Sequence, residues 1–256
     1  MLGHSGKAAR QWLDDTWRVV HFGAQIMVLA LSPSSYGRTH RRALAWHLYR
    51  NTAPILLWFT VLCALLSLVI TRIVVATAFS YGLPQYALQV VIRVLVLELI
   101  PLAAALFVAL RCTLPGGAEL AELQRRGVLA SLRQAGLDPL HQEVLPRVVA
   151  GIFSTLMLAA LSCVVALILA YLAVYGLTPA GSAGYARLFG QVFSPAVVLI
   201  LVLKVLSFSL AVSLIPMLSA LHLRTGSGTN AELRGLVRMF VLILLIEVAS
   251  LLGNYY

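Results

Sequence analysis

The sequence RCTLPGGAELAELQRRGVLASLRQAGLDPLHQEVLPR, residues 111–147, is the long polar interruption of an otherwise apolar chain. Its composition from Glu119 to Ala135 is compatible with a helix. Helix-breaking residues bound this stretch, with Gly116-Gly117 before it and Gly136-Leu137-Asp138-Pro139 after it. We therefore expect a charged, water-exposed helix between two membrane spans, placed where a partner outside the membrane can bind it.

The composition places the chain in a membrane. Its 256 residues are 61% hydrophobic and 11% charged, whereas soluble domains carry about 25% charged residues. Crossing the hydrocarbon layer takes about 20 mainly apolar residues, and five segments meet that length. The sequence thus predicts an all-α integral membrane protein. The predicted spans are Pro54 to Phe79, Tyr86 to Leu110, Val148 to Tyr175, Val192 to Leu221 and Leu236 to Gly253.

The basic residues are distributed unevenly along the chain. Of 19 Lys and Arg, 7 precede Pro54, 5 lie within 111–147 and 3 lie between His222 and Arg238. The connection 80–85 carries none, and 176–191 carries only Arg187. The positive-inside rule then predicts a cytoplasmic N-terminus and a C-terminus on the other side. The net charge of +10 follows this topology, so it does not indicate nucleic-acid binding.

The first fifty residues do not form a span. Polar side chains recur at intervals of three or four from Lys7 to Gln25, while Trp12, Val19 and Ile26 fall on another face. This pattern predicts an amphipathic helix lying in the membrane interface. A signal peptide is the competing interpretation, but the short apolar run before Pro33 is followed by no good cleavage site.

Catalytic and cofactor chemistry is not indicated. The only lysines, Lys7 and Lys204, lie in no phosphate-binding loop, so ATP would have to be bound by a partner subunit. The histidines lie outside the spans or at their edges, away from the intramembrane serines. The three widely spaced cysteines form neither a disulfide framework nor a metal-ligand cluster. We expect no catalytic residue, no metal and no cofactor of the chain's own.

Charged residues inside the spans are the chemically informative positions. Each costs about 2.5–3.5 kcal/mol on insertion scales and usually faces a partner or a cavity. Glu98, Lys204 and Glu247 either form structural pairs between helices or line a cavity for an amphipathic cargo. Arg93 and Glu98 are five residues apart and are not expected to pair directly in an α-helix. Pro101 should kink the second span, because it lacks a backbone N–H.

Several motifs resemble one family. They resemble the pattern of the MlaE (YrbE-like) permeases of ABC lipid transporters in their spacing from Glu98 to Gly151. The chain also has a lysine, Lys204, in the next-to-last of five spans, as that family does. The matching stretches are Glu98-Leu99-Ile100-Pro101, Arg111, Ala118-Glu119-Leu120, Gly136-Leu137-Asp138-Pro139-Leu140 and Pro146-Arg147-Val148-Val149-Ala150-Gly151.

The resemblance implies an assembly. Two permease chains, identical or different, would be flanked by ATP-binding cassette ATPase subunits, with an MCE-domain protein on the periplasmic side. Such complexes move phospholipids or related lipids between the bacterial inner membrane and the outer envelope. The chain would be a single permease domain, with a cytoplasmic or interfacial helix at 1–50, a coupling segment at 111–147 and a periplasmic loop at 177–191.

The resemblance also implies site residues. Glu98 and Lys204, with Arg93 and Leu97, would border the lipid cavity. The residues expected to couple to the ATPase are Arg111, Glu119, Glu122, Arg133, Asp138, Pro139 and Arg147.

The chain departs from the family pattern at the cavity and at the coupling surface. Leu97 stands where relatives usually carry arginine, and Arg93, one turn earlier, is placed to replace it. Gly127 and Arg133 stand where acids are common, so the coupling surface here is more basic.

Two other functions remain open at this stage. One is a permease-like scaffold subunit that moves nothing itself. The other is an ion-coupled secondary carrier with Glu98 or Glu247 as its proton site. The polar segment 111–147 argues against the carrier, which needs no contact with a motor subunit.

Overall fold

The computed structural model describes residues 21–26, 28–29, 38–176, 182–222 and 228–255. Every regular element in this part of the chain is helical, with η denoting π-helical segments. After a helical stretch at 21–26, the elements are α2 (Arg38–Ser80), α3 (Pro84–Val91), η2 (Ile92–Leu99), α4 (Ile100–Val108), η3 (Ala109–Thr113), α5 (Leu114–Arg125), α6 (Val128–Gln134), η4 (Leu140–Val144), α7 (Leu145–Tyr175), α8 (Ser182–Val192), α9 (Pro195–His222) and α10 (Gly228–Tyr255).

Five of the helical segments are long and apolar enough to cross a membrane. They run over Thr52–Ser80, Tyr86–Arg125, Leu140–Tyr175, Pro195–Leu221 and Leu233–Asn254. Large apolar side chains such as Leu57, Trp58 and Leu199 lie exposed on their surfaces, as expected where lipid replaces water. The prediction of an all-α, multi-pass membrane protein with five spans is confirmed.

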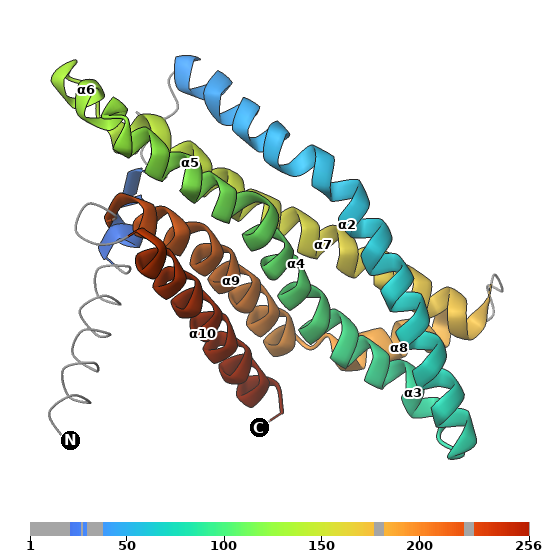
Figure 1. Ribbon diagram of the computed structural model, residues 1–256. Helices are drawn as coiled ribbons and strands as arrows, with labels where there is room; N and C mark the ends of the chain where they lie inside the picture. The colour runs from blue at the N-terminus through green and yellow to red at the C-terminus, as the bar shows by residue number, and fades with distance from the viewer. Residues whose placement is uncertain (1–20, 27, 30–37, 177–181, 223–227, 256) are drawn as a thin grey trace, which may run out of the picture.

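The spans pack as a bundle in which α7 is central. It lies along α2 on one side and contacts α9 and α4, while α10 packs on α9. Figure 1 shows α5, α6 and the start of α2 at one end of the bundle, which we call the α6 end, and α3 and α8 at the other. Phe208 of α9 and Leu158 of α7 are fully buried between these helices.

The helix is not broken at Gly116-Gly117, and that part of the sequence-based expectation is wrong. Helical structure continues from Pro84 through α5 to Arg125. Gly117 has a packing role, because a Cβ there would lie 3.1 Å from the backbone oxygen of Pro216 in α9. The turns come later, at Gly127 and Gly136, where φ is 75°, a value that glycine adopts without strain.

The N-terminal region reaches the core of the bundle. In the helical stretch 21–26, Phe22 and Ile26 are buried in a cluster with Leu214 and Leu218 of α9, while His21 and Gln25 are exposed. This stretch is amphipathic as predicted, and its apolar face packs on protein. Trp12, placed on the apolar face of the interfacial helix from the sequence, lies outside the described residues.

The connection between the third and fourth spans contains a helix, α8. Tyr185 of α8 donates a hydrogen bond to the carbonyl oxygen of Leu167 in α7 at 2.9 Å, and its ring packs edge-on against Tyr171. Burial raises the pKa of the Tyr185 phenol. The connection, expected from the sequence as a loop, therefore contains a helix that packs on α7.

Candidate functional site

A buried ionic cluster joins three spans. Lys204 of α9 has a side chain that is only 1% exposed, and its Nζ forms ion pairs with Glu98 of η2 and with Glu247 of α10, the latter at 2.8 Å. Asn254 of α10 donates from Nδ2 to Glu98 Oε1 at 3.2 Å. The sequence left open whether Lys204 pairs with Glu98 or with Glu247. The structure shows both pairs together.

The ammonium group of Lys204 lies among three acceptor groups, although Glu247 Oε2 has no hydrogen-bond partner among the described residues. The ammonium has three N–H donors, and it contacts the two carboxylates and the carbonyl oxygen of Leu97 at 3.2 Å. The Phe208 ring lies 5.8 Å from Nζ. Two carboxylates around one ammonium give the cluster an excess negative charge when all three groups are ionised. In a low-dielectric setting, removing the lysine would leave two acids without a countercharge.

Pro101 explains why the cluster forms at this point of the second span. A proline cannot donate to the carbonyls of the preceding turn, and the eight residues Ile92–Leu99 before it wind as a π-helix. The two carbonyls four and five residues earlier are bound by side chains instead. Lys204 donates to the oxygen of Leu97, and Cys163 of α7 approaches that of Val96 at 3.5 Å. The predicted irregularity at Pro101 thus supplies part of the cluster.

The other predicted cavity residues have different surroundings. Leu97 has a side chain that is 4% exposed and packs in an apolar cluster, so it contributes through its backbone oxygen. Arg93 is partly exposed, and its buried Nε has no hydrogen-bond partner among the described residues. The structure therefore brings Glu98 and Lys204 together and leaves Arg93 outside their hydrogen-bonded contacts.

Asn254 is the member of this site that the sequence did not suggest. Glu247 was recognised as an intramembrane charge, and Asn254 follows it by seven residues, which is about two helical turns. That spacing places both side chains on one face of α10. The sequence signal that could have indicated Asn254 was a polar side chain near the end of an apolar span, on the same helix face as Glu247.

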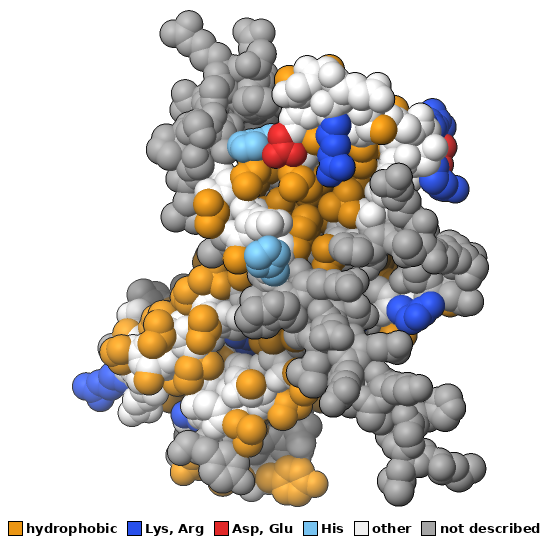
Figure 2. All heavy atoms as spheres, turned by 90° about the vertical axis from the view of Figure 1, so that its left-hand side faces the viewer, with side chains coloured by type: hydrophobic (Ala, Val, Ile, Leu, Met, Phe, Trp, Pro, Cys, Tyr) orange, Lys and Arg blue, Asp and Glu red, His pale blue; other side chains and the backbone are white. Residues whose placement is uncertain are grey.

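The predicted coupling residues all lie at the α6 end. Glu122 forms ion pairs with Arg125 and Arg126, both at 2.7 Å. Arg133 is exposed on α6. Asp138 accepts a hydrogen bond at Oδ1 from the N–H of Leu140 at 3.1 Å. Figure 2 shows this end, with acidic, basic and histidine side chains beside a largely apolar surface.

The remaining coupling residues differ in burial. Pro139 is buried. Arg147 has a side chain that is 10% exposed, and its Nη1 lies 2.5 Å from Glu143 Oε2 and 2.6 Å from the Glu143 carbonyl oxygen. Arg111 and Glu119 are exposed and line one polar pocket together with Arg147. Not all of these residues are thus available on the outer surface.

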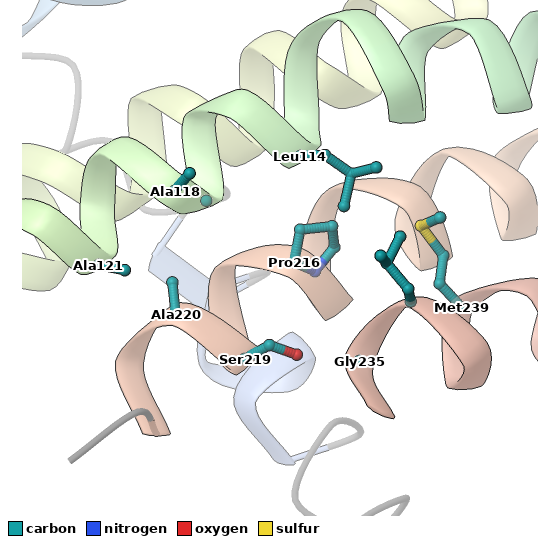
Figure 3. Close-up of a pocket in the computed structure, with 10 residues that line it drawn as sticks. Leu114, Ala118, Ala121, Pro216, Ser219, Ala220, Gly235 and Met239 are labelled. Carbon is teal, nitrogen blue, oxygen red and sulfur yellow. The ribbon is translucent and has the colours of Figure 1, made fainter. Parts of the chain in front are cut away.

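An apolar pocket of about 190 Å³ lies between α5, α9 and α10 (Figure 3). Small residues make room for it, among them Gly117 and Ala118 of α5, Ala220 of α9 and Gly235 of α10. A Cβ at Gly235 would lie 2.3 Å from Ser219 Oγ, so this glycine lets α9 and α10 approach closely. The lining contains no charged side chain, and the pocket suits only an apolar group.

Within the described residues, no group of three or more His, Cys, Asp or Glu side chains is placed to hold a metal ion. Cys63, Cys112 and Cys163 are free thiols. The polar groups that the structure gathers are those of the ionic cluster and of the α6 end.

The comparison with protein families gives one match. The family description "Permease MlaE" matches residues 44–252, which include four spans in full, the fifth except its last two residues, the ionic cluster up to Glu247 and the coupling residues. No curated protein matches the chain. The match and the five spans indicate a non-enzymatic, multi-pass membrane subunit of an ABC-type transporter, which works with partner subunits. The chain belongs to the MlaE permease family.

Proposed function

We propose that the chain is the permease through which a phospholipid or a related lipid moves between a bacterial inner membrane and the outer envelope. The observation that carries this proposal is the cluster of Glu98, Lys204 and Glu247, buried among three otherwise apolar spans. An amphipathic cargo needs a polar contact at membrane depth for its headgroup. A lysine shared by two acids supplies one, because it can pair with a lipid phosphate in place of one carboxylate while the displaced carboxylate takes up a proton.

A purely structural role is the competing explanation of the cluster. Buried ion pairs contribute little net stability, and apolar residues of similar volume often replace them at no cost. This cluster also uses two acids where one would neutralise the lysine. We infer that the second acid serves the exchange with cargo.

The α6 end is proposed to receive the motor subunit. The exposed charges Arg133 and Asp138 lie there, on α6 or just after it, following the second span. A push on α5 would pass along one helix toward η2 and Glu98. The partner would be an ATP-binding cassette ATPase, which supplies the ATP site that this sequence lacks.

The rest of the assembly follows from family membership and charge distribution. We propose a dimer with a second permease chain, identical or related, and an MCE-domain protein at the periplasmic face. The basic α6 end would face the cytoplasm and the C-terminus the periplasm.

The test is lipid transfer by the reconstituted complex in proteoliposomes, with a fluorescent phospholipid as cargo. The variant is Glu98→Gln, Lys204→Met and Glu247→Gln together, which removes all three charges and leaves no unpaired partner. We expect assembly to persist and lipid transfer to fall at least about tenfold, the effect of losing about 1.4 kcal/mol of cargo contact. Arg187→Gln on α8 is the matched control.

Three results would contradict the proposal. Transfer by the triple variant at the rate of the control would make the cluster structural. A rate of ATP hydrolysis by the unsubstituted complex that does not depend on lipid would favour the scaffold function. Transfer that needs a proton gradient and no ATP would favour the carrier.

A further inference from the structure

A second polar site lies at the α6 end of the bundle, separate from the ionic cluster. It is a pocket of about 300 Å³ between α2, the η3–α5 segment and α7. Pro54 of α2, Arg111 and Glu119 of the second helical segment, and Arg147 of α7 line it. Unlike the apolar pocket between α5, α9 and α10, it presents both signs of charge.

One of its cations is fixed in place. Arg147 is nine-tenths buried, and its Nη1 is held by the side-chain and main-chain oxygens of Glu143. A guanidinium has further N–H donors, so Arg147 can still donate into the pocket that it lines. Glu143 itself is not among the lining residues.

The other two charges are available. Arg111 and Glu119 are exposed, and no hydrogen bond or ion pair joins either of them to another residue in the described part of the chain. Arg111 lies in η3 and Glu119 in the following helix, α5, and both line the same pocket. The pocket is therefore lined by the fixed cation Arg147 and by Arg111 and Glu119, neither of which has a side-chain partner among the described residues.

The span boundaries predicted from the sequence put the pocket near the depth of lipid headgroups. Three predicted spans have their boundaries at it, because Pro54 begins the first, Arg111 follows the last residue of the second, and Arg147 precedes the third. Directly toward the membrane, Leu57 and Trp58 of α2 and Leu110 beside Arg111 are 68%, 71% and 62% exposed. Tryptophan is enriched at membrane interfaces, and these apolar side chains can contact acyl chains.

We propose that this pocket binds the headgroup of a phospholipid with a primary amine, from the leaflet at the α6 end. The phosphate lies between Arg111 and Arg147, since guanidinium groups donate in pairs to phosphate oxygens. The ammonium group lies against Glu119. The site is distinct from the ionic cluster, and its occupancy does not depend on transport. A bound lipid here would fix α2, α5 and α7 to one another at the end where the motor docks.

Native mass spectrometry of the full-length chain in detergent tests the proposal with defined lipids. Phosphatidylethanolamine should be retained better than phosphatidylglycerol, which has a phosphate but no amine. Arg111→Gln should lower retention of both lipids about tenfold, the effect of one charge-assisted contact. Glu119→Gln should abolish the preference for the amine lipid and leave phosphatidylglycerol retained as before. Arg187→Gln is the control and should change neither.

The alternatives give different results. Arg111→Gln behaving like Arg187→Gln would overturn the site. Equal retention of the two lipids by the unsubstituted chain would overturn the role of Glu119. Millimolar inorganic phosphate that displaces the bound lipid would show a free-anion site and overturn the lipid assignment.

A photocrosslink in membranes containing the whole complex decides between a lipid and the motor. Pro115, which lines the pocket and is exposed, is replaced by benzoylphenylalanine. Lipid adducts support the proposal, and adducts to the ATPase subunit would show that protein occupies the pocket. Because neither experiment measures transport, their failure would leave the proposed transport function standing, and failure of transport would leave this site standing.

Discussion

The ionic cluster and the charges at the α6 end differ in whether their members are paired within the protein. At membrane depth, Lys204 forms ion pairs with Glu98 and Glu247 within the chain, and the lysine side chain is 1% exposed. At the α6 end, Arg111, Glu119 and Arg133 are exposed, and Arg111 and Glu119 have no ionic partner among the described residues. The difference indicates that the three charges of the ionic cluster are neutralised within the protein, whereas Arg111 and Glu119 stay available for external partners.

The largest effect is expected from Lys204→Met alone. It leaves two buried acids without a countercharge, and breaking a buried ionic group costs about 3–5 kcal/mol. We expect the melting temperature in detergent, followed by tryptophan fluorescence, to fall by about 10 °C. The triple substitution that also neutralises both acids should recover most of this loss. A melting temperature unchanged by Lys204→Met would break the comparison, because burial would then not require pairing.

A smaller effect is expected from Arg133→Glu on α6. If relatives carry acids on this surface, the substitution should strengthen assembly with the ATPase of a typical relative and weaken it with the native one, each by several fold, since like charges disfavour the wrong partner. Size-exclusion chromatography of the mixed subunits measures this.

Arg133→Gln controls for the favourable placement of a cation in the last turn of α6. A second acid at Gly127 would confuse the result, because its φ of 75° would strain any other residue by about 1–2 kcal/mol. Unchanged assembly with both ATPases would mean that α6 does not touch the motor.

The smallest effect is expected from Glu122→Gln. The ion pairs of Glu122 with Arg125 and Arg126 are exposed and lie within one helix, and such surface pairs contribute little. We expect no measurable change in melting temperature at physiological salt. A fall comparable to that of Lys204→Met would show that exposure does not separate the two groups of charges.

Much of the fold was predictable because hydropathy is a property of the chain itself. Each span needs only its own apolar residues to enter the bilayer, so five spans were expected and five are present. The consequences of Pro101 were also local, since a missing N–H disturbs its own helix wherever that helix packs. Of the candidate site, the sequence indicated Glu98 and Lys204 as costly charges at membrane depth.

The remainder depended on neighbours that the sequence does not specify. Gly116-Gly117 was interpreted as a helix break because glycine lowers helix propensity, yet Gly117 is required by the backbone of Pro216 lying 3.1 Å from where its Cβ would be. Likewise, the burial of Arg147 follows from the packing of α7 among other helices, although its ion pair with Glu143 is a local pair four residues apart in the chain. Both features belong to contacts between segments.

Thus the sequence by itself determined the membrane class, the number of spans, the polar segment between the second and third, and the presence of costly intramembrane charges. Only the tertiary structure decided that one lysine serves two acids on different spans, that Asn254 joins them, and that three span boundaries enclose a pocket with both signs of charge. The physical reason is that insertion into lipid depends on each segment's own composition, whereas the pairing of charges depends on which helix faces meet after insertion.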